Sequence, residues 1–290
     1  MKTVGLLHHP KLSTSLPLAH EAQKLLEGLG ARVWLSSTWD PEKAKTLLPG
    51  TELLVTFGGD GTILRAARMA YRHGIPILGV NLGKLGFLSE VAPSQLAESV
   101  PRWLNGEGWL EQRIMLEARL PRQGLSAESA REELVDDSHW DGGMVFQALN
   151  DVVVSRATVS RIIDVRATID GADLAVYRAD GLIVSTPTGS TGYSLAAGGP
   201  ILYPEDRNII LTPIAPHLSF PRSVVLPPTA IVELNLQAAR QASLSVDGQI
   251  DVALEAGDSI LVRCSPHVVR FLRFRPRTYF TEALARLVLK

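Results

Sequence analysis

In the N-terminal part of the chain, short apolar runs alternate with stretches in which apolar residues recur every three or four positions. The runs are typical of strands buried on both faces, and the stretches between them are typical of amphipathic helices. The expected strands are Val4–Leu7, Ala31–Leu35, Leu53–Phe57 and Ile75–Val80, and the expected helices include Leu18–Leu29, ended by Gly30, and Pro41–Leu48. This alternation predicts an α/β domain with a parallel, doubly wound sheet.

The pattern changes after Pro93 and one more expected helix, Ser94–Leu104. Short alternating or apolar runs follow, with Gly, Asp and Pro between them, and they predict a β-rich second domain. The expected strands are Arg113–Leu120, Ala148–Ser155, Ile162–Ile169, Gly181–Thr186, Ile231–Leu236, Ala242–Val246 and Ser259–Arg263, with tight turns at Asp170-Gly171 and Asp247-Gly248. Alternation in Val268–Arg275 predicts a strand with its arginines on an outer face, before a helix at Thr281–Val288.

Composition narrows the class of protein. The 290 residues favour two domains, and 46% apolar with 20% charged residues is ordinary for a soluble globular enzyme. A net charge of −1 provides no field to gather nucleic acid or an anionic membrane, so neither is an expected partner. The single cysteine, Cys264, and the absence of a signal peptide or a long apolar run predict a cytoplasmic protein.

The stretch Gly58–Thr62, Gly-Gly-Asp-Gly-Thr, follows a buried strand and opens a helix. Gly59 and Gly61 remove the Cβ atoms on either side of Asp60, so that a ligand can approach the backbone, and free N–H groups at a helix start favour a phosphate. Asp60 alone could simply cap the helix. The whole motif after an apolar strand instead favours a phosphotransfer site, with the glycine-rich loop Asn81–Leu88 beside it.

A second unusual stretch, Asp180–Pro200, runs from a strand into a loop of glycine and hydroxyl residues that contains Tyr193. Such a loop offers backbone N–H groups, hydroxyls and one aromatic face for a base. It is neither a Walker loop nor a dinucleotide-binding glycine turn. It predicts a nucleotide site.

Other polar stretches have simpler interpretations. Asn150-Asp151 could bracket sugar hydroxyls or a hydrated Mg²⁺, or form a turn before a strand, and alone it favours the turn. Lys84 is expected to be solvated, and the acidic segment 124–143 is expected to form a solvated loop. The seven scattered histidines predict no zinc site, so no resident metal is expected.

Together these stretches resemble the NAD kinase family. The matching segments lie in family order over nearly the whole chain: Gly58–Thr62, Asn81–Leu88, Asn150-Asp151, Asp180–Pro200, Ala215–Phe220 and Asp247–Gln249. Lipid kinases and phosphofructokinases carry related Gly-Gly-Asp-Gly motifs, but the long Thr-Pro-Thr-Gly-Ser-Thr-Gly-Tyr-Ser loop distinguishes NAD kinases from them. The family fold implies an α/β domain at 1–100 plus 277–290, with the C-terminal helix packing back on it, and a β-rich NAD-binding domain at 101–276.

The resemblance implies transfer of the ATP γ-phosphate, or that of another phosphoryl donor, to the 2′-hydroxyl of the NAD adenosine ribose, with Mg²⁺ or another divalent cation. Asp60 would orient or deprotonate that hydroxyl, and Asn150 and Asp151 would hold the adenosine. Thr191 and Tyr193 would line the adenine and nicotinamide pockets, while Asp180 would reach the nicotinamide end, often from a neighbouring subunit of a homodimer or homotetramer. Further binding residues expected in the matched motifs are Gly59, Gly61, Thr62, Phe87, Thr188, Gly192, Ser194 and Gln249.

The chain departs from the family pattern in three places. Asp151 replaces the commoner Glu, Gly192 stands where alanine is usual, and Ala196 where serine is common. These departures bear on the choice between NAD and NADH. Two alternatives to an NAD kinase remain: a kinase for another hydroxyl such as a lipid's, which needs a deep apolar cleft, and a nucleotide sensor without catalysis, which intact Asp60 and Asn150-Asp151 disfavour.

Overall fold

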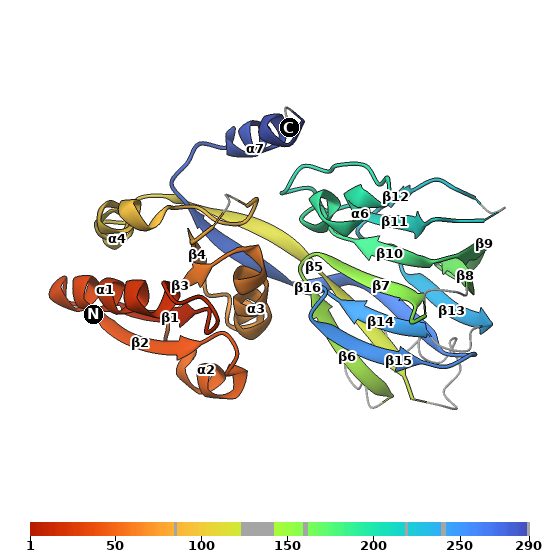
Figure 1. Ribbon diagram of the computed structural model, residues 1–290, viewed down its shortest axis with the longest axis horizontal. Helices are drawn as coiled ribbons and strands as arrows, with labels where there is room; N and C mark the ends of the chain where they lie inside the picture. The colour runs from red at the N-terminus through yellow and green to blue at the C-terminus, as the bar shows by residue number, and fades with distance from the viewer. Residues whose placement is uncertain (84–85, 123–141, 159–161, 218–219, 239–241, 289–290) are drawn as a thin grey trace. The chain divides into compact units, whose positions relative to one another are not determined.

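The computed structural model describes residues 1–290 except 84–85, 123–141, 159–161, 218–219, 239–241 and 289–290 (Figure 1). Lys84 and most of the acidic segment 124–143 therefore lie outside the described residues. The chain forms two compact units, Met1–Arg113 with His267–Lys290, and Ile114–Pro266. It passes from one unit to the other within β5 (Trp109–Pro121) and returns within β16 (Ser259–Arg273).

The first unit is built on a parallel sheet in the strand order β2-β1-β3-β4-β16. Its other strands are β1 (Thr3–His8), β2 (Arg32–Ser37), β3 (Leu53–Gly58) and β4 (Ile77–Asn81). The helices are α1 (Ser15–Gly28), α2 (Pro41–Leu47), α3 (Asp60–Ala70), α4 (Leu96–Leu104) and α7 (Tyr279–Val288), with 3-10 turns at Tyr71–His73 and Pro93–Gln95.

Helices cover both faces of this sheet, which confirms the doubly wound prediction. Leu78 and Val80 of β4 belong to a core shared with α1 and α4, whereas Gly79 between them faces Ile63 of α3. A Cβ on Gly79 would overlap the Ile63 side chain, so this strand carries glycine where α3 comes close. The predicted end of α1 is also confirmed, since Gly30 adopts φ 82°.

The C-terminal helix packs back on the first unit, as expected. The Phe280 ring lies 5.9 Å from the Phe87 ring, centroid to centroid. Arg113 donates a hydrogen bond to the Tyr279 hydroxyl at 2.8 Å. The helix begins at Tyr279, slightly before the predicted start.

The second unit is β-rich, as predicted, and has an antiparallel sheet in the order β12-β11-β10-β7-β14-β15. These strands are β7 (Asp151–Arg156), β10 (Gly181–Ser185), β11 (Ile209–Ile214), β12 (Val224–Leu226), β14 (Ala242–Val246) and β15 (Ile250–Leu254). A second layer contains β8 (Ile163–Ile169), β9 (Ala172–Ala179) and β13 (Val232–Ala238), with β6 (Gly143–Ala148) paired to β5. A short 3-10 turn, Gly189–Thr191, and the helix α6 (Tyr193–Ala196) complete the unit.

An apolar core fills the space between the layers of the second unit. Val152 and Val154 of β7 meet Val165 and Val232 of the other layer in it, and all four are at most 1% exposed. Both predicted tight turns are confirmed, because Asp170 and Asp247 each have φ 52° and are followed by a glycine of positive φ.

Two predictions about β16 are wrong. The segments Ser259–Arg263 and Val268–Arg275 were expected as separate strands, but a single strand runs from Ser259 to Arg273. The expectation that the arginines of this segment lie on an outer face also fails for Arg273, which is 0% exposed. Its guanidinium is ion-paired with Glu90 and Glu111 inside the first unit. Alternation along a strand cannot reveal such buried pairing, because the partners come from distant segments.

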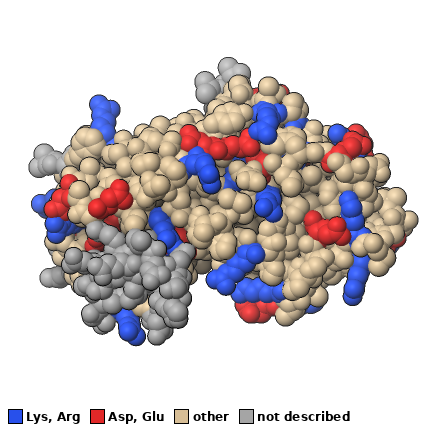
Figure 2. Space-filling model, turned by 180° about the vertical axis from the view of Figure 1, so that it is seen from behind, with Lys and Arg blue, Asp and Glu red and all other residues tan. Residues whose placement is uncertain are grey.

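No helix among the described residues is long and apolar enough to cross a membrane. On the face of the molecule shown in Figure 2, basic and acidic side chains of the described residues are interspersed.

Candidate active site

Asp60 lies at the carboxyl end of a parallel strand, where ligands bind in open α/β sheets. β3 ends at Gly58 and α3 begins at Asp60. A Cβ on Gly58 would overlap the Thr62 side chain, so that glycine lets the helix close tightly on the strand. Cβ atoms on Gly59 and Gly61 would instead meet no other atom within 4 Å. The backbone beside Asp60 is therefore open to a ligand.

The Asp60 carboxylate is directed at the loop after β4 and not at its own helix. It accepts hydrogen bonds from the backbone N–H groups of Phe87 at 3.0 Å and Leu88 at 3.4 Å. The cap of α3 is Gly59, and no side chain bonds to it, so the alternative that Asp60 only caps the helix does not hold. Gly86 makes the contact possible, since a Cβ there would overlap the carboxylate.

Burial raises the pKa of Asp60, while the N–H groups of Phe87, Leu88 and Ser89 and the charge of Arg273 act in the opposite direction. Burial has the largest effect because it removes water from the charged carboxylate. A carboxylate with a raised pKa is a better proton acceptor. Asp60 thus has the environment of a general base.

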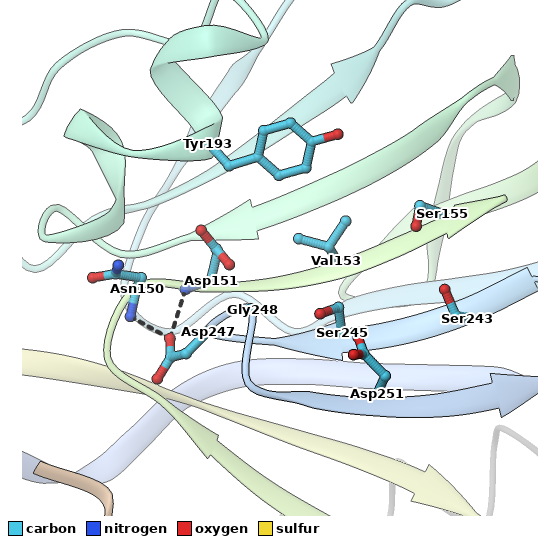
Figure 3. Close-up of a pocket in the computed structure, with 10 residues that line it drawn as sticks. All are labelled: Asn150, Asp151, Val153, Ser155, Tyr193, Ser243, Ser245, Asp247, Gly248 and Asp251. Carbon is cyan, nitrogen blue, oxygen red and sulfur yellow. Dashed lines mark hydrogen bonds between the residues drawn. The ribbon is translucent and has the colours of Figure 1, made fainter. Parts of the chain in front are cut away.

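The second unit contains a pocket of about 440 Å³ over the six-stranded sheet (Figure 3). This volume is within the range of small-molecule sites. Tyr193 projects from α6 on one side, and the rest of the wall comes from β7, β14, β15, the residue before β7 and the turn between β14 and β15. The lining residues are Asn150, Asp151, Val153, Ser155, Tyr193, Ser243, Ser245, Asp247, Gly248 and Asp251. Most of these residues are polar and several are acidic, so the pocket suits a ligand rich in hydrogen-bond donors.

Asp247 holds the backbone at the start of β7. Its carboxylate accepts hydrogen bonds from the N–H groups of Leu149 at 3.0 Å, Asn150 at 2.7 Å and Asp151 at 3.2 Å. The turn that carries it needs positive φ at two successive residues, which Asp247 and Gly248 provide at 52° and 61°. Sequence reasoning treated Asp247 as only part of a hairpin turn and so missed its place in the pocket.

Asn150 and Asp151 both line the pocket, although these two residues taken alone predicted only a turn before a strand. Burial, and to a lesser extent the negative charge of Asp247, raises the pKa of Asp151 to about 7. The Oδ1 atom of Asn150 is buried without a hydrogen-bond partner among the described residues. An unsatisfied buried acceptor in a pocket wall is suited to a donor from a ligand.

The loop after β10 supports Asn150 from behind. The Thr186 N–H donates to the Asn150 carbonyl at 2.9 Å, and the Thr186 hydroxyl donates to the Leu149 carbonyl at 2.6 Å. A Cβ on Gly189 would overlap the Asn150 carbonyl, so glycine is needed where the loop crosses this segment.

Of the described residues in the loop after β10 and in α6, only Tyr193 lines the pocket, and it is 47% exposed. Ser194 is fully buried and shares a 3.1 Å hydrogen bond with Thr212, and Thr188 is buried as well. The Thr191 hydroxyl donates to the Thr188 carbonyl at 3.3 Å, and Gly192 leads into α6. These four expected binding residues shape the loop that presents Tyr193.

The remaining expected residues lie outside the pocket lining. Asp180 forms an ion pair with Arg156, with 2.9 Å between Oδ1 and Nε. The Gln249 N–H donates to the Val246 carbonyl at 3.0 Å and closes the Asp247-Gly248 turn. Ser243, Ser245 and Asp251 were not predicted to line a pocket, although the alternation of Ala242–Val246 signals that Ser243 and Ser245 share one face of the strand. The described residues contain no group of three or more His, Cys, Asp or Glu that could hold a metal ion.

Two family models match the chain. The ATP-NAD kinase N-terminal domain matches residues 18–108, and the ATP-NAD kinase C-terminal domain matches residues 149–274. An NAD kinase of Dehalococcoides mccartyi is 41% identical over 284 residues, which are 98% of this chain and 94% of that protein. An NAD kinase of Chloroflexus aggregans is 38% identical over 288 residues, which are 99% of each chain.

Solved structures share the fold. A crystal structure of a yeast NADH kinase complexed with NADH matches with a TM-score of 0.81 at 25% identity, over 99% of this chain and 87% of that one. An NAD kinase from Archaeoglobus fulgidus in complex with ATP matches with a TM-score of 0.73 at 24% identity, over 98% of each chain. Because the family models and the relatives extend over both units, the chain belongs to the ATP-NAD kinase family.

Proposed function

We propose that this protein is an NAD kinase, which transfers the γ-phosphoryl group of ATP to the 2′-hydroxyl of the adenosine ribose of NAD and forms NADP and ADP. The observation that carries the proposal is the position of Asp60. A half-buried carboxylate of raised pKa lies next to open glycine backbone, at the carboxyl end of a strand, in a chain of the ATP-NAD kinase family.

The reaction forms a bond between the ribose oxygen and the γ-phosphorus and breaks the bond from that phosphorus to the oxygen shared with the β-phosphate. Asp60 orients the hydroxyl and accepts its proton as the new bond forms. The backbone of Gly59, Gly61 and Thr62 at the start of α3 is suited to the phosphates. Phe87 fixes the carboxylate through its N–H group.

We assign NAD binding to the pocket of the second unit. Asn150 and Asp151 accept hydrogen bonds from the adenosine part, and Tyr193 stacks on a base. Thr188, Thr191, Gly192 and Ser194 hold the loop that presents Tyr193, and Gln249 closes the turn under Asp247. Asp180, oriented by Arg156, serves the nicotinamide end. On this proposal the first unit carries the phosphotransfer motif and the second unit binds NAD.

A divalent cation, Mg²⁺ or a similar ion, accompanies the ATP phosphates in this proposal. Mg²⁺ typically uses one or two carboxylates together with substrate phosphates and water, so a site of this kind needs no preformed cluster of protein ligands. Asp60 is the carboxylate beside the open backbone. The cation would supply charge neutralisation on the transferred phosphate.

We further propose that the protein is a cytoplasmic homodimer or homotetramer. The second unit exposes several large apolar side chains, including Ile201 and Tyr203 just after the Tyr193 loop and Val225 on β12, and a partner subunit could cover them. Light scattering coupled to size exclusion measures the subunit number directly, and a monomer would contradict this part of the proposal.

The function is tested by incubating the purified protein with ATP, Mg²⁺ and NAD and measuring NADP. Formation of NADP is the expected result. Tight NAD binding without NADP would instead indicate a nucleotide sensor, and phosphorylation of diacylglycerol but not of NAD would indicate a lipid kinase. Parallel reactions with polyphosphate and with NADH identify the preferred donor and acceptor.

A further inference from the structure

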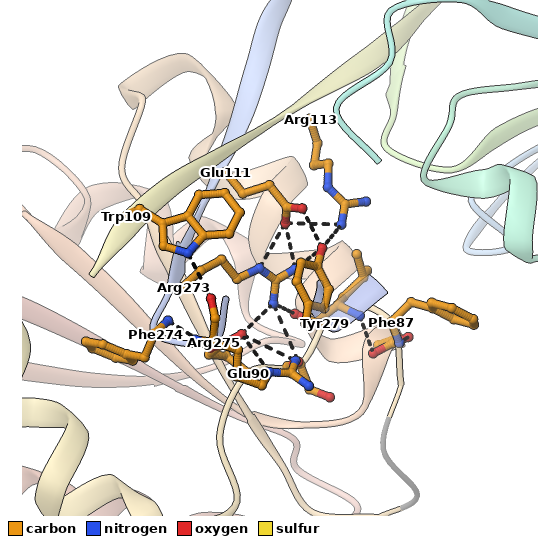
Figure 4. A network of polar contacts seen from close by, with 12 residues as sticks. Phe87, Glu90, Trp109, Glu111, Arg113, Arg273, Phe274, Arg275 and Tyr279 are labelled. Atoms are coloured by element: carbon orange, nitrogen blue, oxygen red, sulfur yellow. Dashed lines mark hydrogen bonds and ion pairs between the residues drawn. The ribbon is translucent and has the colours of Figure 1, made fainter. Parts of the chain in front are cut away.

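The first unit contains a buried group of charged side chains that the proposed chemistry does not use. We call it the Arg273 cluster, and Figure 4 shows its members gathered around the Arg273 guanidinium. The members are Arg273, Glu90, Glu111, Arg113, Arg275 and Tyr279. They come from the loop after β4, from β5, from β16 and the segment that follows it, and from the first residue of α7.

Arg273 is the centre of the cluster. Its side chain is 0% exposed and forms ion pairs with Glu111 at 2.8 Å and with Glu90 at 3.1 Å. Glu111 also accepts hydrogen bonds from Arg113 at 3.1 Å and from the Tyr279 hydroxyl. All three guanidinium nitrogens of Arg273 are thus directed at carboxylates, Nε and Nη2 at Glu111 and Nη1 at Glu90, and Nη1 has a further target.

That target is the backbone next to Asp60. Nη1 of Arg273 donates to the Leu88 carbonyl at 2.9 Å, and Nη2 of Arg275 donates to the Ser89 carbonyl at 2.7 Å. The N–H groups of Phe87 and Leu88 are the donors to the Asp60 carboxylate. The segment Phe87–Ser89 is therefore held on both sides, by Asp60 through its N–H groups and by the two arginines through its carbonyls.

Stability alone does not explain a fully buried cation. Removal of water from the charges of such a cluster costs about as much free energy as their pairing returns, and apolar residues can often replace it. The planar guanidinium holds its five N–H donors in fixed directions and reaches Glu90, Glu111 and Leu88 at once, whereas a lysine ammonium has three donors on a flexible stem. This geometry is suited to fixing the position of a backbone segment.

We propose that Arg273 is a positioning residue for Asp60, which acts by holding the Phe87–Ser89 backbone whose N–H groups orient the Asp60 carboxylate. The inference rests on the proposed function for its kinetic consequences. Glu90 and Glu111 keep the guanidinium in place, and Arg275 supports the same segment from Ser89.

The test is the variant Arg273→Lys, which keeps the buried positive charge but loses the directed donors. We expect kcat for NADP formation to fall at least ~10-fold, with KM for NAD within about twofold of the wild-type value. Because N–H donors favour the ionised carboxylate, a looser segment raises the pKa of Asp60, and the acidic limb of the kcat profile should move to higher pH. Amide hydrogen exchange in a peptide covering residues 87–89 should become at least ~10-fold faster.

The matched control is Arg119→Lys, because Arg119 is also a buried arginine, paired with Glu117 at 2.9 Å in the other unit. The control should keep the wild-type kcat, pH profile and exchange in residues 87–89, even where its melting temperature falls. If Arg273→Lys behaves in the same way, the proposal is overturned. If the wild-type protein forms no NADP, the proposed function fails, and unchanged exchange in residues 87–89 of Arg273→Lys would separately overturn the positioning role.

Discussion

Asp151 and Asp247 share two hydrogen bonds, both of which use the Asp151 backbone. The Asp247 carboxylate accepts from the Asp151 N–H at 3.2 Å, and the Asp247 N–H donates to the Asp151 carbonyl at 3.0 Å. Two buried carboxylates thus lie side by side in the pocket wall, at 6% and 7% exposure. Asp247 is occupied with backbone N–H groups, so of these two carboxyl groups Asp151 is the one that a ligand can meet.

Asp247→Asn tests the support of the pocket. The amide replaces one acceptor oxygen with a donor, so at least one of the N–H groups of Leu149, Asn150 and Asp151 loses its partner, at about 1–3 kcal/mol. We expect KM for NAD to rise at least ~10-fold, as determined from initial rates. Asp170→Asn is the control, because Asp170 has the same φ of 52° before a glycine but holds only the Ile231 N–H in a different turn. A wild-type KM in Asp247→Asn would contradict the supporting role.

The pKa of Asp151 predicts how stability changes with pH. The value is about 7 in the folded protein, against about 4 in an unfolded chain. Between these two pH values the folded state therefore keeps a proton that the unfolded chain releases. The stabilisation that this proton contributes to the free energy of unfolding is complete below pH ~4 and is lost as the pH rises to about 7. At one pKa unit per about 1.4 kcal/mol, its upper limit is about 4 kcal/mol.

Asp151→Asn removes this titration, because the amide resembles the protonated carboxyl group and cannot ionise. Thermal melts at a series of values from about pH 5 to about pH 8 should show the variant gaining stability relative to wild type as the pH rises. Parallel curves over this interval would show that Asp151 is ionised throughout.

Asp60→Asn tests the proposed base. The amide keeps an oxygen for one of the two backbone N–H donors but cannot accept the hydroxyl proton. We expect kcat for NADP formation to fall at least ~100-fold, with KM for NAD changed by less than about threefold. Circular dichroism should confirm that the variant is folded. Normal turnover would remove Asp60 from the reaction.

Gly86→Ala tests the orientation of Asp60 without changing any polar group. Because the added methyl would overlap the carboxylate, Asp60 must move away from Phe87 and Leu88. We expect at least a ~10-fold loss of kcat. Gly83→Ala in the same loop is the control, since its Cβ would meet no other atom within 4 Å, and it should retain full turnover. Equal losses in the two variants would mean that the loop, and not the Asp60 contact, is sensitive.

Much of the architecture follows from local patterns. Apolar periodicity predicts the parallel α/β domain and the β-rich domain, and Asp170-Gly171 and Asp247-Gly248 mark turns because positive φ is a local property of the backbone. The strands β9, β11 and β12 were not predicted, since strand formation there depends on neighbours contributed by distant segments. For the same reason, the sequence pattern predicted two separate strands where the structure has the single long strand β16.

Only part of the candidate site could be predicted from the sequence. Gly58–Thr62 and the loop with Tyr193 stand out because they combine residue types that ordinary turns rarely need. Ser194 illustrates the limit: the matched motif predicts a binding residue, and only the structure shows that its hydroxyl shares a hydrogen bond with Thr212. Asp247 illustrates the opposite case, a turn residue whose carboxylate supports the pocket.

The sequence by itself determined the two fold classes, the family resemblance and the importance of Asp60, because periodicity, glycine placement and motif order are written along the chain. The tertiary structure alone decided what these side chains contact. The pairing of Asp60 with Phe87, of Asp247 with Asn150 and of Arg273 with Glu111 joins segments that are far apart in sequence. Hydrogen bonds and buried charges depend on distances of a few ångströms, and only the packed sheets bring such groups together.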